Sequence, residues 1–219
     1  MRLVLADTTP DCVQAWSAQF LKRPEVEIRE SHVFDAEADA FLLPGNSFGF
    51  LDSGLALEAC ERFGWDLQEE VRRMVRTEFS GELLVGQAVA IRMATLPTLV
   101  IYAPLWRTPR KLEGTVNAYL ALRGASLALS KAMGLQWPLE LTSPGVANPA
   151  HPRLAVPALG VKEGGLDPRI SARQIRYAYE VSTGQRGFGD KNLTQQARRE
   201  RKLLLVPGIA REDGEDSGE

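Results

Sequence analysis

The sequence predicts an α/β fold. Short apolar runs of strand length alternate with longer segments whose apolar residues recur at three- and four-residue steps. Two of the apolar runs, 40–43 and 154–157, lead directly into glycine-rich loops, and a helical segment follows each loop. Units of strand, loop and helix in this order are typical of folds in which helices cover a mostly parallel sheet.

Length and composition are those of a single domain with additional segments. The chain has 219 residues, of which 44% are hydrophobic, so it can bury one substantial core. The formal net charge is −2, which gives no reason to expect a strongly basic surface for nucleic acid. Sequence features thus supply no direct support for nucleic-acid binding.

The cysteines and the hydropathy pattern argue against a disulfide-bonded, zinc-binding or membrane-spanning protein. Cys12 and Cys60 lie on two predicted helices without metal-like spacing, so we expect reduced core thiols and no zinc site or disulfide. No apolar run reaches membrane-spanning length, and the N-terminus lacks a basic-then-apolar signal pattern. We therefore expect a cytoplasmic location, no membrane partner, no metal and no cofactor.

The first third of the chain predicts alternating strands and helices. A short apolar strand covers 2–6, and a helix beginning at Pro10 ends before Pro24, with threonine hydroxyls available as caps. A half-exposed strand follows at 26–29, and the central strand lies at 40–43.

Two helices and an antiparallel pair of strands follow. The first helix runs from Gly54 to a C-cap at Gly64, and the second covers 67–75. Arginines 72, 73 and 76 on its outer side are interpreted as a solvated face rather than a nucleic-acid patch. Alternating residues at 86–91 and the apolar run 98–103 predict strands joined by a turn.

The second half predicts one more strand between two helices. Thr115 is the expected N-cap of a long helix that ends at Gly134. The Pro- and Gly-rich segment 136–152 reads as an irregular excursion, and 154–157 as a buried strand. Asp167 followed by Pro168 is a strong start signal for the last helix of the domain.

The pattern weakens after residue 180. Residues 181–211 are expected to form an extension that is partly docked, with a basic helical segment near 194–202 and an apolar run, Leu203 to Val206, that should not stay exposed. The acidic end, 212–219, is expected to be disordered.

Two glycine-rich loops are the main candidates for function. The first contains Gly45, Gly49, Ser53 and Gly54, and the second contains Gly160, Gly164 and Gly165. Because the C-terminal ends of parallel strands meet at one edge of a sheet, both loops are expected to lie there and to form a diphosphate pocket from backbone N–H groups. The alternative is that these glycines serve tight turns alone.

The first loop, in DAFLLPGNSFGFLDSG (39–54), resembles that of macrodomains, in particular a bacterial subgroup whose loop reads like PANSFGFMDGG. The resemblance returns in IYAPLWRTP (101–109), TVNAYLALRGASLAL (115–129) and VPALGVKEGGLDPRISARQIRYAY (156–179). It implies a three-layer α/β/α domain with a central mixed sheet over residues 1–180. It also implies binding of ADP-ribose, or of an ADP-ribosylated macromolecule.

The resemblance also implies a set of ligand-binding residues: His32, Val33, Gly45, Asn46, Ser47, Ser53, Gly54, Leu55, Leu159, Gly160, Val161, Lys162, Glu163, Gly164 and Gly165. Asn46 would hold the distal ribose, unless it only tolerates a left-handed turn. His32 stands where many macrodomains have an Asp for the adenine amino group. Lys162 and Glu163 replace small residues; Lys162 could pair with phosphate, Glu163 would repel it, and the neutral interpretation is a solvated loop tip.

Catalysis is the point at which the chain departs from the family. The position of the Asp that orients water in hydrolytic macrodomains is Ala56, so Asn46 and Asp52 are the remaining catalytic candidates, and Asp52 could equally be a capping residue. Three functions stay open: an ADP-ribosyl hydrolase or ADP-ribose phosphoester processing enzyme, a non-catalytic reader of ADP-ribosylated protein or nucleic acid, and an assembly protein on the same scaffold. Ser47 has no histidine partner in its sequence context, which disfavours a serine hydrolase.

Overall fold

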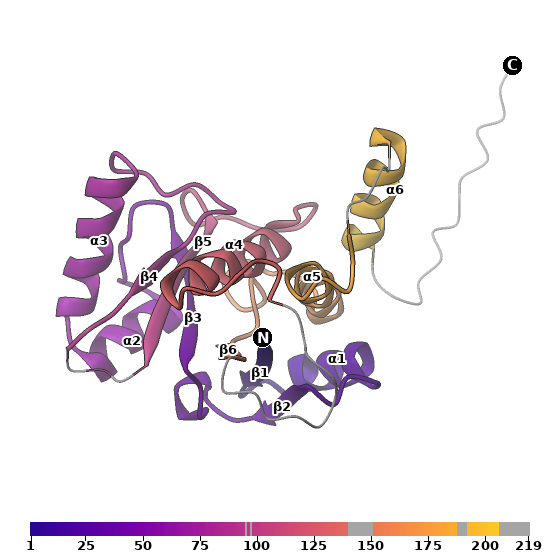
Figure 1. Cartoon of the computed structure of the whole chain (residues 1–219), viewed down its shortest axis with the longest axis horizontal. Helices are drawn as coiled ribbons and strands as arrows, with labels where there is room; N and C mark the ends of the chain where they lie inside the picture. Colours follow the sequence, from indigo (N-terminus) through magenta and orange to yellow (C-terminus); the bar gives the residue numbers. More distant parts are fainter. Residues whose placement is uncertain (95, 97, 140–150, 188–191, 206–219) are drawn as a thin grey trace, which may run out of the picture.

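A six-stranded sheet lies between helices on both of its faces (Figure 1). The computed structural model describes residues 1–94, 96, 98–139, 151–187 and 192–205. The strands are β1 (Arg2–Asp7), β2 (Val26–Glu30), β3 (Ala40–Asn46), β4 (Val89–Ile91), β5 (Leu99–Trp106) and β6 (Arg153–Val156). The helices are α1 (Pro10–Phe20), α2 (Gly54–Phe63), α3 (Asp66–Glu78), α4 (Asn117–Ala132), α5 (Pro168–Ser182) and α6 (Leu193–Leu204), with a 3-10 helix, η1, at Val33–Asp35.

The sheet is mixed, as predicted. Its strand order is β2-β1-β6-β3-β5-β4, and β4 pairs antiparallel with β5 while the other pairs are parallel. The parallel arrangement brings the C-terminal ends of β1, β3, β5 and β6 to one edge of the sheet. Both glycine-rich loops begin at that edge.

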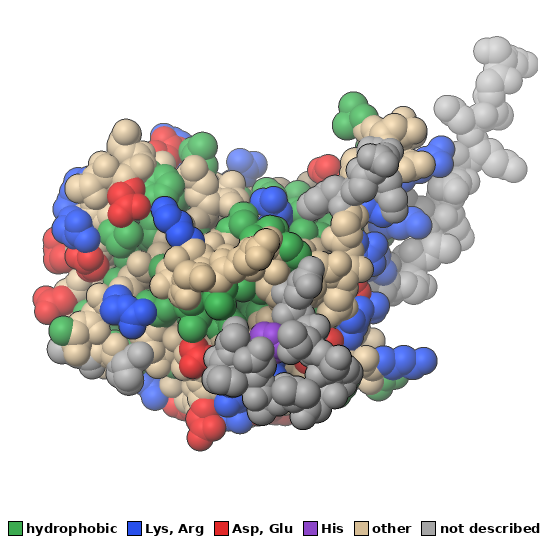
Figure 2. Space-filling view, viewed as in Figure 1, with side chains coloured by type: hydrophobic (Ala, Val, Ile, Leu, Met, Phe, Trp, Pro, Cys, Tyr) green, Lys and Arg blue, Asp and Glu red, His purple; other side chains and the backbone are tan. Residues whose placement is uncertain are grey.

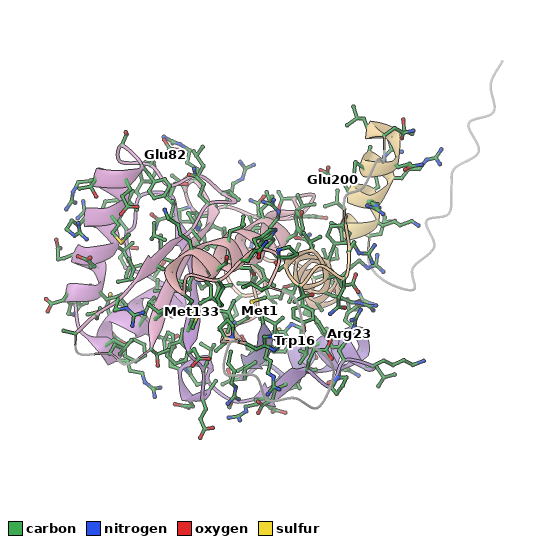
Figure 3. The ribbon with its side chains drawn as sticks, in the orientation of Figure 1. Met1, Trp16, Arg23, Glu82, Met133 and Glu200 are labelled. Atoms are coloured by element: carbon green, nitrogen blue, oxygen red, sulfur yellow. The ribbon has the colours of Figure 1, made fainter. Side chains whose placement is uncertain are left out.

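The central strands are buried on both faces, which explains their unbroken apolar sequences. In β3, Ala40 and Leu42 belong to the core shared with α1, α4 and α5, whereas Phe41 and Leu43 belong to the core shared with α2 and α3. Figure 3 marks Trp16 of α1, which is 1% exposed and lies in the first of these cores. Alternate residues of β3 therefore pack against the helices on opposite faces of the sheet.

Most of the expected helix ends are confirmed. Gly64 ends α2 with its N–H donating to the carbonyl of Cys60, and the Asp167 side chain caps α5 by accepting from the Arg169 N–H. Pro10 starts α1, but the threonine hydroxyls do not cap that helix; the Asp7 carboxylate accepts from the Thr9 N–H instead.

Two local predictions are wrong. Thr115 does not cap α4, because its hydroxyl donates to the carbonyl of Leu112 and the helix begins at Asn117. The strand expected at 86–91 is shortened to Val89–Ile91. Gly86 has a φ of +98°, and the Gln87 N–H donates to the carbonyl of Leu84, so this part of the segment forms a turn.

Helix α6 packs against α5 and extends away from the three layers (Figure 1). Leu203 is 6% exposed, and the Arg173 guanidinium donates to the carbonyls of Lys202 and Leu205 at 2.6 and 3.0 Å. These contacts hold the last turn of α6 against α5. The boundary of the extension at residue 180 stays a prediction. Val206, the acidic segment 212–219 and residues 140–150 of the expected excursion lie outside the described residues.

The surface carries both signs of charge. Figure 2 shows acidic and basic side chains interspersed at the edge formed by α3, while Lys and Arg gather on the side of α5 and α6. Among the described residues, no helix is both long enough and apolar enough to cross a membrane.

Candidate functional site

A cavity of about 200 Å³ opens at the C-terminal edge of the sheet. Its walls come from the ends of β1, β3, β5 and β6, from the first turns of α2, and from both glycine-rich loops. This is where ligands collect in open α/β sheets, because loops of several strands converge there.

Tyr102 of β5 holds the start of the first loop. The β3–β5 register shifts between Gly45 and Asn46, and at this irregularity the Tyr102 hydroxyl donates to the Asn46 carbonyl at 2.6 Å and accepts from the Asn46 N–H at 2.9 Å. Burial raises the pKa of Tyr102 above its ordinary value, so the phenol stays protonated and able to donate. A Cβ at Gly45 would lie 2.3 Å from the same hydroxyl, which is why glycine is required there.

The Asn46 carboxamide is largely used within the loop. Its Oδ1 accepts from the N–H groups of Phe48 and Phe50 at 3.0 and 3.3 Å, and its Nδ2 donates to the Phe50 carbonyl at 2.8 Å. Asn46 lines the cavity, and one Nδ2 hydrogen is left for a ligand. Its geometry therefore serves the turn directly, and the predicted role on the distal ribose remains a prediction.

Helix α3 supports the tip of the first loop. The Leu51 N–H donates to Gln68 Oε1 at 2.8 Å, and the guanidinium of Arg72 lies 4.5 Å from the centre of the Phe50 ring. Phe50 is 43% exposed and lines the cavity mouth. Arg72 thus packs on a loop aromatic residue, which the interpretation as a solvated face did not include.

The second loop is a compact turn around Gly160. The Leu166 N–H donates to the Gly160 carbonyl at 2.9 Å, and the Gly164 carbonyl accepts from the Leu112 N–H at 2.9 Å. A Cβ at Gly164 would lie 2.5 Å from the Gly160 carbonyl, so the turn itself requires glycine there. The geometry of the turn explains why glycine is needed in this loop. Ligand binding would be a second role for the same residues.

Lys162 and Glu163 cross the cavity from the second loop. The ammonium of Lys162 lies 3.6 Å from Asp7 Oδ1. Glu163 reaches the opposite wall: a Cβ at Gly54, whose φ is +51°, would lie 1.5 Å from Glu163 Oε1. Both side chains are exposed to solvent, as expected for a loop tip, but the Glu163 carboxylate is turned toward the first loop.

His32 and Glu58 are joined by a hydrogen bond, and both line the cavity. The Phe34 N–H donates to His32 Nδ1, so Nε2 carries the proton and donates to Glu58 Oε2 at 2.7 Å. The predicted role of His32 in place of an adenine-binding Asp stays a prediction. A carboxylate is nevertheless present beside His32, supplied by α2.

Most of the predicted ligand-binding residues line the cavity: His32, Val33, Gly45, Asn46, Ser53, Gly54, Leu55, Gly160, Val161, Lys162, Glu163 and Gly164. The structure does not place the three others, Ser47, Leu159 and Gly165, in the lining, and Asp52, the catalytic candidate, is not part of it either. Ser47 is buried, and its carbonyl accepts from the Leu83 N–H. Leu159 is also buried and its carbonyl accepts from the Ser171 hydroxyl, while Asp52 is exposed outside the cavity.

Sequence reasoning missed several lining residues, among them Asp7, Thr8 and Trp106. Helical periodicity predicts that Glu58, two residues after Ala56, faces away from the site, and this is wrong, because Glu58 lines the cavity. Asp7 is 7% exposed, and its carboxylate accepts from the N–H groups of Thr9 and, at 3.4 Å, Ala158. It directly follows the apolar run 2–6 in the sequence, which was the available signal. Burial, with the charge of Asp7 next, raises the pKa of the Cys12 thiol to about 11.

The fold and the cavity place the chain among proteins with the macrodomain fold. No protein-family model and no curated protein matches the sequence. The solved structures do give matches, which confirm the three-layer α/β/α fold with a mixed sheet that the resemblance implied.

Two macrodomains of DarG proteins are similar over most of their length. The Mycobacterium tuberculosis domain has a TM-score of 0.52 and 17% identity, with 70% of this chain and 90% of that chain covered. The Thermus aquaticus domain has a TM-score of 0.51 and 17% identity, with 68% and 87% covered. Thermosipho africanus DarTG in complex with ADP-ribose has a TM-score of 0.52 and 17% identity; the match covers 80% of this chain and 44% of that longer chain.

Proposed function

We propose that the chain binds ADP-ribose, or the ADP-ribosyl group of a modified macromolecule, in the cavity at the C-terminal edge of the sheet. The observation that carries the proposal is the meeting of both glycine-rich loops across one cavity at that edge. The macrodomain fold supports it, and one protein of similar fold, Thermosipho africanus DarTG, was solved in complex with ADP-ribose.

The ends of the cavity suggest an orientation for the ligand. The His32–Glu58 pair lies at the position where the family resemblance places adenine recognition, and the Glu58 carboxylate can accept from an exocyclic amino group. Phe50 and Trp106 lie at the wall formed by the first loop and β5, where an apolar sugar face could pack. Gly54 and Gly164 also line the cavity and would border the diphosphate.

Binding without efficient turnover is the expected activity. Ala56, which stands at the family's catalytic Asp position, lines the cavity and has no ionisable group. Asp52 is exposed outside the cavity, so it is poorly placed to orient a water on the distal ribose. A substrate phosphate could still help to activate water, which would allow slow hydrolysis.

The second candidate function is a reader of ADP-ribosylated protein or nucleic acid without turnover, and the alanine at position 56 favours it. An assembly role through Leu203 to Val206 has less support, because Leu203 is buried against the chain itself. Binding of free ADP-ribose separates the assembly role from the other two.

Calorimetric titration with ADP-ribose tests the binding proposal. Wild-type protein should bind, and Gly54→Glu should not, because a carboxylate would fill the cavity next to α2 and repel the diphosphate. Gly81→Glu is the matched control: Gly81 also has a positive φ, of +93°, and lies outside the cavity lining with no atom within 4 Å of an added Cβ. Equal affinity of wild type and a folded Gly54→Glu variant would refute the proposed cavity.

Release of ADP-ribose from an ADP-ribosylated substrate tests turnover. We expect little release by wild type and an increase in Ala56→Asp, because the new carboxylate would reach the reacting ribose if the assignment of this position is right. Robust wild-type release that persists when Asp52 and Asn46 are both replaced by Ala would place the chemistry elsewhere.

A further inference from the structure

The second loop places an anionic group across the cavity, against the first residue of α2. The ideal Cβ position of Gly54 lies 1.5 Å from Oε1 and 2.6 Å from Cδ of Glu163, so the carboxylate occupies the space that a side chain at Gly54 would fill. The substitution Gly54→Glu is expected to abolish diphosphate binding by filling this same space. The wild-type chain already has a carboxylate there, supplied by the other loop.

No hydrogen bond or ion pair fixes this carboxylate within the part of the chain that the structure describes. The neighbouring cation, Lys162, lies beside Asp7 instead, at 3.6 Å. Two other carboxylates, Asp7 and Glu58, also line the cavity, and Glu58 pairs with His32. Glu163 is therefore the lining carboxylate that can leave its place without breaking a polar contact to the described residues.

We propose that Glu163 is a specificity-determining residue, which sets the charge that the cavity accepts between Gly54 and the second loop. This inference rests on the proposed binding of ADP-ribose. A ligand with a diphosphate must displace the Glu163 carboxylate from Gly54 and then bind with that like charge close by. A ligand without phosphate, such as adenosine, meets no such repulsion at the end formed by His32 and Glu58.

The size of the effect follows from the exposure of the carboxylate. Two like charges about 4 Å apart in a water-like dielectric change a binding constant by roughly fivefold. The effect should shrink at high salt, because the Debye length falls from about 10 Å at 0.1 M to about 3 Å at 1 M, which is shorter than the separation of the two charges. Removing the carboxylate is thus expected to tighten ADP-ribose binding by about fivefold at low salt.

The test compares ADP-ribose and adenosine on four proteins by calorimetry. Glu163→Gln keeps the size of the side chain and removes its charge, while Glu163→Ala removes both. Glu113→Gln is the matched control, since Glu113 is exposed, lies outside the cavity lining and changes the net charge by the same amount. Circular dichroism and thermal melts establish that all four proteins are folded.

The inference expects both Glu163 variants to bind ADP-ribose more tightly than wild type and Glu113→Gln, with adenosine affinity unchanged. Binding by the Glu163 variants in the absence of measurable wild-type binding would support it as well. Equal ADP-ribose affinities of the Glu163 variants and wild type would overturn the inference and leave the binding proposal intact. An equal gain in adenosine affinity would have the same two consequences. Failure of all four proteins to bind ADP-ribose would instead refute the proposed function, and the inference with it.

Discussion

Tyr102→Phe should destabilise the protein and loosen the first loop. The substitution removes one oxygen atom from a fully buried side chain and leaves the ring in place. That oxygen makes two hydrogen bonds, to the carbonyl and to the N–H of Asn46. Both backbone groups lose their partner, while the packing of the ring between the sheet and α3 is retained.

The magnitude follows from these two unpaired groups. A buried polar group without a partner costs about 1–3 kcal/mol, and because the cavity lets water approach Asn46 we expect a total near the lower end, about 2–4 kcal/mol. For a protein of this size that corresponds to a fall in Tm of about 4–16 °C. ADP-ribose affinity should fall in parallel, since the loop no longer has a fixed start.

Urea unfolding followed by circular dichroism measures the change in the free energy of unfolding at constant m-value. Tyr119→Phe is the matched control: Tyr119 is half-buried, its ring packs on Tyr177, and its hydroxyl makes no hydrogen bond among the described residues. We expect this control to stay within about 0.5 kcal/mol of wild type. A Tyr102→Phe variant equally close to wild type would refute the assigned role of the hydroxyl.

Three further predictions concern other parts of the chain. Burial by itself raises the pKa of Glu180, but hydrogen bonds and charge from Arg176 and Arg186 outweigh it and lower the pKa below the ordinary 4.5. A lowered carboxyl pKa gives stability that is present above pH 4.5 and lost as the pH falls through the folded value. Glu180→Gln should therefore lower the free energy of unfolding at pH 7 by about 1–2 kcal/mol and weaken its dependence on acid pH. Identical profiles of the free energy of unfolding against pH for the variant and wild type would contradict this. Asn46→Ala should reduce ADP-ribose affinity at least about tenfold, because the Asn46 carboxamide folds the loop. The amide signals of Phe48 and Phe50 should broaden in NMR spectra for the same reason. Unchanged spectra with lost binding would assign Asn46 to the ligand alone. Deleting 212–219 should leave Tm unchanged, whereas deleting 203–219 should lower Tm or solubility; equal behaviour of the two truncations would disprove the docking of α6.

The elements that could be predicted are those whose signals are local. Gly54 and Gly64 bracket α2 because glycine at each end needs a positive φ, and both bounds agree with the sequence. The alternating burial of β3 follows from an apolar run that must face two cores. The prediction that Thr115 caps α4 was wrong because a threonine hydroxyl can either cap a helix or bond to the preceding turn, and the sequence alone does not decide between the two.

The parts of the site that could not be predicted depend on contacts between distant segments. Asp7 reaches the cavity only because β1 lies beside β6 in the sheet, an order that no local pattern encodes. Glu58 lies beside His32 through the packing of α2 against η1 and β3, and the direction of Glu163 depends on the absence of a side chain at Gly54. Charge at a loop position can be read from a sequence, whereas the direction in which it points cannot.

The place of β1 inside the sheet has a consequence for biosynthesis. Strand β1 pairs on one side with β2, which follows closely in the chain, and on the other with β6, where Leu3 pairs with Leu154. At about 5–20 residues per second, a ribosome needs on the order of ten seconds to deliver β6 after β1. During that interval one edge of an apolar strand has no partner, which exposes it to non-native pairing. Chaperone dependence during synthesis, and slow refolding of the isolated chain compared with folds of local topology, are therefore expected of this arrangement.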